Sequence, residues 1–166
     1  MASRKNLSRT LSSWLEVPET IESAVGGLTE TDLDLRGGPD GYSIRENVHH
    51  LVEANLIASN IIIAALSNSG IKYDWSWVNP DKSWMQRLGY DKAPIGPAIA
   101  TLRALCRHIA GLIGSNQDAS RREVKLLDNP GAGLYSMTVE GMIQQEVGHA
   151  KEHMDHVAQT RKQHGC

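Results

Sequence analysis

The sequence predicts an all-α protein built as a four-helix bundle, and three observations support this fold class. Apolar residues recur at intervals of three and four over long stretches, which is the spacing of one helix face. No run shows the sustained apolar–polar alternation of a half-buried strand. The length of 166 residues, with 40% hydrophobic content, suits one core. We therefore expect residues 1–166 to form a single domain with four main helices.

The first helical region should cover about residues 7–28 and contain an interruption. Pro18 lies inside it, and the proline ring removes a backbone donor and clashes one turn back. After one further helical turn at residues 29–34, the glycine-rich segment 37–41 predicts a turn.

The second helix has the best-defined start in the sequence. Ser43 and Glu46 have the Ser-x-x-Glu spacing of a capping box, so the helix should begin at Ile44. It should continue to about Leu66, before the turn-forming residues 68–70.

The third and fourth helices should occupy residues 97–115 and 138–161. The connection at residues 68–96, with a short helix expected at 81–88, is long, whereas antiparallel neighbours usually need only a few linking residues. Its length favours a crossover that lets the third helix run parallel to the second. Another irregular stretch, residues 115–137, leads to the last helix.

The charge balance and the hydrophobic pattern argue against nucleic acid and membranes as partners. With 17 basic and 19 acidic residues, the formal net charge is −2, so no strong field attracts nucleic acid or an anionic membrane. No apolar run of signal-peptide length follows the N-terminus, and no segment approaches the roughly 18 apolar residues of a spanning helix. We expect a cytoplasmic protein that acts on a small molecule. Cys106 and Cys166 lie far apart and suggest neither a disulfide framework nor a cysteine-based zinc site.

Histidines on the second and fourth helices form a candidate metal site. His149 and His153 are four residues apart, which places them on one helical face about 6 Å apart. Two imidazoles at this spacing can bind one divalent ion, and His50 from the second helix can complete the face. Each histidine alone is as well explained by a core or boundary position. Their joint occurrence on neighbouring helices favours a metal site.

Helical projection separates the candidate ligands from their neighbours. His50 shares a stripe with apolar residues, whereas His49 falls among polar ones and is expected to face solvent. On the last helix Glu146 projects toward the core. Because an inward carboxylate is costly to bury unless it is paired, Glu146 is a candidate ligand, imidazole-orienting partner or general base. His156 lies at the rim and has the weakest claim.

Aromatic residues gather in the connection between the second and third helices: Tyr73, Trp75, Trp77 and Trp84. Rings in such a segment usually anchor it on the bundle. A second hypothesis is that they cover the metal site and select the substrate.

Two motifs resemble the DinB/YfiT-like superfamily of four-helix bundles. Residues 41–51 read GYSIRENVHHL, which is similar to the aromatic-Ser-Ile-x-Glu-x-x-x-His-Leu opening of that family's second helix. Residues 138–142 read TVEGM and are followed by His149, His153 and His156, as in the family's last helix. The resemblance spans about residues 7–161. Tyr42 stands where the family often has tryptophan, and the adjacent His49 makes the choice of His50 as first ligand less direct.

The resemblance implies an up-down-down-up bundle, frequent homodimers and a divalent metal, often zinc or nickel. It also implies His50, His149 and His153 as the ligands, with water in the open positions. Members similar to this chain include S-transferases that use low-molecular-weight thiols, a thiol-dependent isomerase and metal-dependent hydrolases. The expected function is therefore a metal-dependent transferase or hydrolase, in which the ion activates a thiol or water and Glu146 assists proton transfer.

Two alternatives stay open. A di-iron carboxylate site would use Glu46-x-x-His49 and Glu146-x-x-His149, but it also needs acids from the other two helices, and residues 97–115 contain none. The other alternative is a non-catalytic bundle that binds a metal or a small ligand.

Overall fold

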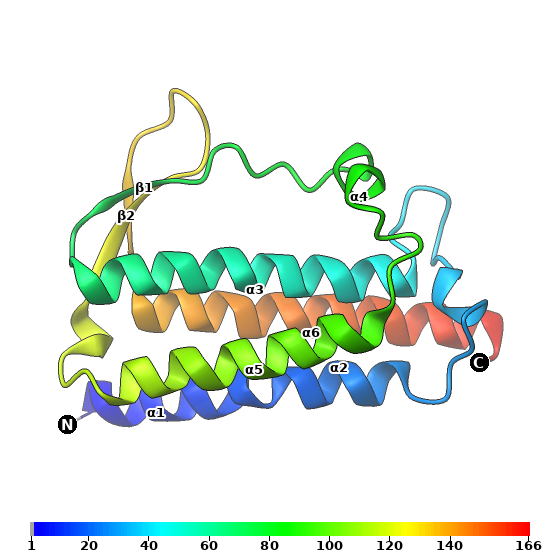
Figure 1. Ribbon diagram of the computed structural model, residues 1–166, viewed down its shortest axis with the longest axis horizontal. Helices are drawn as coiled ribbons and strands as arrows, with labels where there is room; N and C mark the ends of the chain where they lie inside the picture. Colours follow the sequence, from blue (N-terminus) through cyan, green and yellow to red (C-terminus); the bar gives the residue numbers. More distant parts are fainter. Residues whose placement is uncertain (1) are drawn as a thin grey trace.

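The computed structural model describes residues 2–166. Its long helices are arranged as four rods (Figure 1). The first rod consists of α1 (Ala2–Leu15) and α2 (Val17–Val25), and the others are α3 (Ile44–Ser67), α5 (Ile95–Gly114) and α6 (Val139–His164). The predicted interruption of the first rod is confirmed, because α1 ends before Glu16 and Pro18 lies in the first turn of α2.

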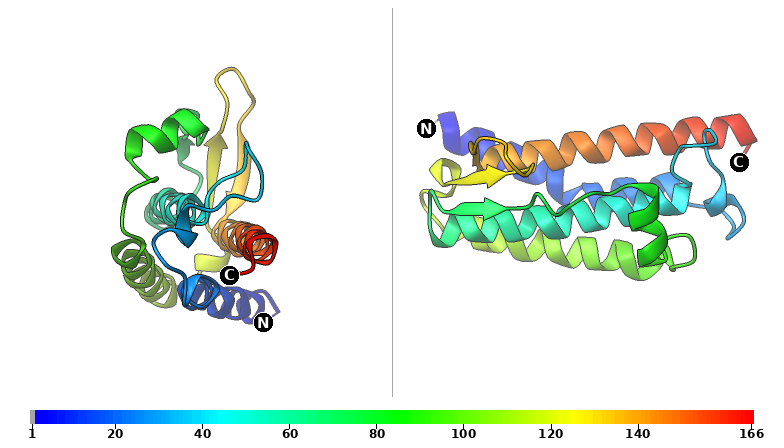
Figure 2. Two further views of the ribbon diagram at one scale, coloured as in Figure 1. Left: turned by 90° about the vertical axis from the view of Figure 1, so that its right-hand side faces the viewer. Right: turned by 90° about the horizontal axis from the view of Figure 1, so that it is seen from above.

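The helices run up-down-down-up, as predicted. In Figure 1, α3 and α5 run in the same direction, opposite to the first rod and to α6. The crossover between α3 and α5 passes over the outside of α3 and carries the short helix α4 (Lys82–Leu88). Asp81 caps α4 by accepting a hydrogen bond from the backbone N–H of Trp84 at 2.7 Å. Figure 2 shows the four rods end-on and from above.

A small sheet joins the two long connections and was not predicted. It consists of β1 (Lys72–Asp74), β2 (Glu123–Leu127) and β3 (Tyr135–Thr138), in that order. β1 pairs with β2 in parallel, and β2 pairs with β3 antiparallel. The strands have three to five residues, too few for alternation to distinguish them from loop. β2 packs against α3 at one end of the bundle (Figure 1).

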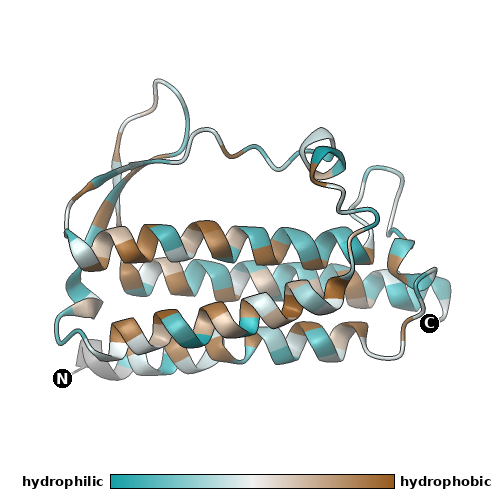
Figure 3. Ribbon diagram, viewed as in Figure 1, coloured by the Kyte–Doolittle hydropathy of each residue, from teal (hydrophilic) through white to brown (hydrophobic). Residues whose placement is uncertain are grey.

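The core lies between the four rods. Its largest fully buried side chains are Trp14, Ile21, Ile44, Leu51, Ile61, Ile62, Leu102, Ile109, Leu126, Met142 and Ile143. Trp14 donates its indole N–H to Asn55 Oδ1 at 2.7 Å, which satisfies a polar pair inside the core. Apolar residues gather along α5 and the second half of α3, whereas polar residues prevail in the last turns of α6 (Figure 3). Two short 3₁₀ helices, η1 (Asp32–Asp34) and η2 (Ala119–Arg121), complete the elements.

The start of α3 is fixed by the predicted capping box. Ser43 Oγ accepts the backbone N–H of Glu46, and the Glu46 carboxylate accepts the backbone N–H of Ser43. Among the helices of residues 2–166, α3 also has the length and mean hydropathy of a membrane span, contrary to expectation. However, 56% of its most apolar window is buried in the bundle, as in the core helix of a globular protein.

Candidate metal centre

The structure brings the three predicted ligands together. His50 on α3 and His149 and His153 on α6 offer ring nitrogens that all lie within 4.8 Å of one another. The Nε2 atoms of His50 and His149 are 3.2 Å apart. Within residues 2–166, this is the one group of at least three histidines, cysteines or acids with such spacing. Imidazole nitrogens at this mutual spacing could bind one shared cation.

His153 is held in one orientation by Asn47. Its Nδ1 lies 2.6 Å from Asn47 Oδ1, while Asn47 Nδ2 donates to the backbone oxygen of Ser43 at 2.7 Å. Because the amide nitrogen already has an acceptor, the amide oxygen must face the ring, and His153 Nδ1 must carry the proton. The lone pair of Nε2 is therefore available to a metal.

Tyr42 packs over the same rings. Its ring centroid is 5.9 Å from that of His153, in a stacked arrangement, and 5.5 Å from that of His50. Its hydroxyl donates to the backbone oxygen of Pro80 at 2.7 Å. Tyr42 thus connects the cluster to the crossover. Sequence reasoning assigned no role to Tyr42 or Asn47, although Asn47 lies three residues before His50 and hence on the same helical face.

Burial keeps two of the imidazoles neutral. Desolvation, with a smaller contribution from His149, lowers the pKa of His50 to about 4. Desolvation, followed by repulsion from His50, His149 and His156, lowers the pKa of His153 to about 3. At neutral pH both rings therefore have an unprotonated nitrogen, which is the form that binds metals.

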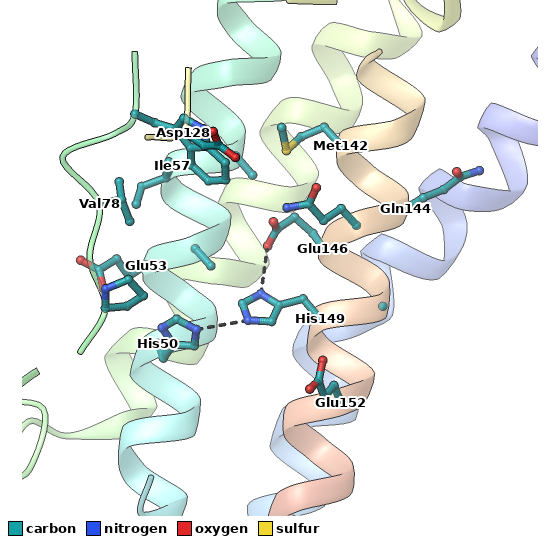
Figure 4. A pocket seen from close by; sticks show the side chains of 16 residues that line it. His50, Glu53, Ile57, Val78, Asp128, Met142, Gln144, Glu146, His149 and Glu152 are labelled. Carbon is teal, nitrogen blue, oxygen red and sulfur yellow. Dashed lines mark hydrogen bonds and ion pairs between the residues drawn. The ribbon is translucent and has the colours of Figure 1, made fainter. Parts of the chain in front are cut away.

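Glu146 faces inward, as predicted. It is 4% exposed, and its Oε2 has no hydrogen-bond partner among the described residues. The same oxygen is 3.8 Å from His149 Nδ1, and Figure 4 shows the carboxyl group directed at that ring. A carboxylate beside the second nitrogen of a ligating histidine typically fixes the ring and its tautomer.

The prediction that His49 faces solvent is wrong. His49 is 9% exposed, its Nε2 lies 3.0 Å from the backbone oxygen of Ala93, and its ring stacks on Tyr90 at a centroid distance of 5.0 Å. The crossover covers this outer face of α3, and helical projection cannot show such a cover. His156 is exposed and lies outside the three-histidine cluster.

The structure does not assemble the di-iron ligand set. Glu46 accepts two hydrogen bonds from the Arg36 guanidinium, one of them at 2.8 Å, in addition to its capping role. His49 points to the crossover, as described above. Both side chains are therefore engaged away from Glu146 and His149.

A cavity of about 570 Å³ opens beside the cluster, between α3, α6 and the crossover (Figure 4). His50, His149 and Glu146 form part of its wall. Of the predicted aromatic cover, Trp75 lines the cavity, whereas Trp77 and Trp84 stack on each other outside its lining. Trp84 donates its indole N–H to Glu53 on α3 at 2.9 Å and so anchors the segment, whereas Trp77 is 58% exposed.

A second cavity of about 520 Å³ lies on the His153 side of the cluster. It is lined by Tyr42, Asn47, His153 and His156, together with the glycine-rich turn at residues 37–41. The cluster therefore contributes to the walls of both cavities, which also share Glu152.

Three curated proteins are similar to this chain in sequence. No family model matches the sequence. Proteins of Geobacillus thermodenitrificans and Geobacillus kaustophilus, both named "Putative metal-dependent hydrolase", are 24% and 26% identical over 152 residues. These alignments cover 90% of this chain and 81% and 80% of the relatives. A Bacillus pumilus protein of the same name is 24% identical over 159 residues, which are 92% of this chain and 85% of the relative.

A solved structure shows the same fold. It is YfiT from Bacillus subtilis, described as a probable metal-dependent hydrolase with an unusual four-helix bundle topology. The two structures agree with a TM-score of 0.83 at 20% identity, over 96% of this chain and 87% of YfiT. This chain therefore has the DinB/YfiT-like fold. Together with the three-histidine cluster, the comparisons support a metal-binding protein of this fold.

Proposed function

We propose that this protein is a metal-dependent hydrolase of small molecules, with a divalent ion held by His50, His149 and His153. The observation that carries the proposal is the convergence of these three rings at the wall of a cavity that is large enough for a small substrate. Imidazole ligands suit zinc and nickel, the two metals that we expect. The names of the curated relatives agree with this class.

The residues around the cluster have distinct tasks in this proposal. A bound divalent ion supplies a Lewis acid that activates water and polarises a carbonyl group. Asn47 holds the proton on His153 Nδ1, so that the Nε2 lone pair would be available to a metal. Glu146 orients His149 and, as a buried carboxylate in the cavity wall, accepts a proton from the attacking water.

Elemental analysis of the purified protein tests the metal site. We expect one zinc or nickel ion per chain in the wild type and none in His50→Ala. His108→Ala is the matched control, because it removes an exposed imidazole from α5 and should leave the metal content unchanged. Equal metal content in all three proteins would refute the ligand assignment. Two ions per chain in the wild type would contradict a mononuclear site and favour the di-iron alternative.

Turnover of an ester and amide panel by the metal-loaded protein tests the activity. If Glu146 accepts the proton, Glu146→Gln should keep the metal and lose about 100-fold or more in kcat. If it only orients His149, the variant should instead lose about 10-fold or more in metal affinity. Hydrolysis that is unchanged by removal of the metal would refute the proposal.

Thiol S-transfer is the second candidate, and the second cavity favours it. Two cavities, one lined by His50 and His149 and the other by His153, leave room for two reactants beside the cluster. Incubation with low-molecular-weight thiols and electrophiles separates the two reactions, because a transferase consumes the thiol whereas a hydrolase does not. If the metal is bound but neither reaction occurs, the non-catalytic binding alternative is favoured.

A further inference from the structure

The charged residues that line the larger cavity are all acidic. They are Glu53 on α3, Asp128 after β2, and Glu146 and Glu152 on α6. No lysine or arginine is among its lining residues. A divalent ion would bring two positive charges, which is fewer than the four carboxylates. The cavity therefore has a negative potential with or without the metal.

These carboxylates also lack basic partners within the described part of the chain. None of the four forms an ion pair with a lysine or arginine, and the single ion pair is the 3.8 Å approach of Glu146 to His149. Glu146 is the informative member, because it is 4% exposed and one of its oxygens has no hydrogen bond. Burying such a group is costly unless a partner arrives, and the cavity is the direction from which a ligand reaches it.

The remaining wall of the cavity is apolar. Ile57 on α3, Val78 on the crossover and Met142 on α6 supply aliphatic surface, and Trp75 supplies an aromatic ring. An indole face attracts cations as well as apolar groups. Figure 4 shows Asp128 at one end of the cavity, with Glu53 and Glu146 between it and the His50–His149 pair. Negative charge therefore extends along the cavity and is not confined to Glu146, which lies beside His149.

From these observations we infer that the larger cavity takes a ligand with an apolar body and a cationic group, such as a protonated amine, and rejects anions. For catalysis the inference rests on the proposed function, since it names the class of substrate that the metal would act on. Recognition of the cation, however, uses carboxylates and apolar walls, so it does not require a bound metal.

Calorimetric binding to the metal-free, full-length protein tests the inference with three probes of similar size: 2-phenylethylamine, 2-phenylethanol and phenylacetate. Metal-free protein is used so that the amine and the acid cannot bind by coordination. We expect the ammonium probe to bind about tenfold or more tightly than the alcohol, and the acid to bind most weakly. Added salt should weaken only the ammonium probe appreciably. Equal affinities for the three probes, or a preference for phenylacetate, would overturn the inference.

Charge-neutralising variants locate the recognition. Asp128→Asn and Glu53→Gln should each weaken binding of the ammonium probe about threefold or more and leave the alcohol unchanged. Glu16→Gln is the control, because Glu16 is exposed and lies between α1 and α2, outside the cavity lining. If the control weakens the amine as much as Asp128→Asn does, net charge and not the cavity determines the preference, and the inference fails.

The two proposals fail separately. If the protein binds no metal but prefers the ammonium probe, the proposed function is refuted and the cation site stands. If it binds the metal but shows no preference among the probes, the substrate class is refuted and the metal centre stands.

Discussion

The two halves of α3 bury different kinds of residue. In the first half every residue from 43 to 50 is buried, and most of these are polar or charged: Ser43, Arg45, Glu46, Asn47, His49 and His50. In the second half the buried residues are mainly apolar, such as Ile61, Ile62 and Leu66. One helix therefore contains a polar network that builds the candidate site and a packed segment that belongs to the core.

The difference reflects what surrounds each half. The second half packs as part of the bundle core and leaves an exposed stripe that includes Ile63. The first half is also covered on its outer side, where Arg45 pairs with Glu30 at 2.8 Å and His49 contacts Ala93. Buried polar groups need partners, and these covering segments provide them. We therefore expect mutations in the second half to affect stability alone. In the first half, mutations at the three-histidine cluster and its partner Asn47 should affect metal binding, whereas those at Glu46 and His49 should affect stability.

The largest effect is expected in the apolar half. Ile62→Ala should lower the free energy of unfolding by about 3 kcal/mol, because it leaves a cavity in the core. Ile63→Ala, at the neighbouring position that is 41% exposed, should change it by less than about 0.5 kcal/mol. Chemical denaturation measures both, and metal content per folded chain should be normal in both. Similar losses at the two positions would contradict the assignment of the core face.

The next effect concerns Asn47 in the polar half. Asn47→Ala should weaken metal binding by about 10- to 100-fold, because His153 loses the partner that fixes its tautomer. Asn60→Ala on the same helix is the control, since Asn60 is exposed and bonds only its own helix backbone. Competition with a chromophoric chelator measures both affinities. Unchanged affinity in Asn47→Ala would show that His153 needs no orienting partner.

A pH-dependent effect is expected at Glu46. Burial raises its pKa, but hydrogen bonds from Arg36 and Ser43 more than offset this, so its pKa lies below the ordinary value. A carboxyl group with a depressed pKa stabilises the fold above its unfolded pKa, and this stabilisation is lost as the pH falls through the folded pKa. Glu46→Gln should therefore cost about 1.5 kcal/mol at pH 7 and progressively less below about pH 4. Unfolding curves from pH 3 to 7 measure this, and a constant difference would contradict it.

The smallest effect on the metal is expected at His49. His49→Gln should leave the metal content unchanged, because the His49 ring faces Ala93 and Tyr90 and not the cluster. It should lower the free energy of unfolding by about 1 kcal/mol through the lost contacts. Elemental analysis of His49→Gln and His50→Ala, measured together, decides which of the two adjacent histidines binds the metal. Loss of the metal in His49→Gln would reverse the choice of ligand.

Local sequence patterns predicted most of the fold. The capping box at Ser43 and the break near Pro18 predicted helix ends correctly, because these signals act within one turn of the chain. The meeting of His50 with His149 and His153 followed from helical spacing together with the family resemblance. The homodimer, the cytoplasmic location and the single-domain assignment stay predictions.

Features that depend on distant segments were not predictable. The sheet requires β1 to pair with β2, which lies about fifty residues later in the chain. Neither strand is long enough to show a recognisable alternation of apolar and polar residues. Burial of His49 depends on the crossover, and the role of Asn47 depends on a ring that comes from α6. Helical projection treats each helix alone. It therefore predicts which residues face the bundle core, but it cannot show which outer faces a connecting segment covers.

The parallel pairing of β1 with β2 has a consequence for how relatives of this protein can diverge. β1 precedes Trp75 on the crossover, and β2 ends just before Asp128, so one ladder sets the positions of two residues of the cavity wall. An insertion within either strand would shift the register and change the position of one residue relative to the other. We therefore expect relatives with new substrate preferences to vary in length at the hairpin tip, residues 128–134, and to conserve the spacing of the paired segments.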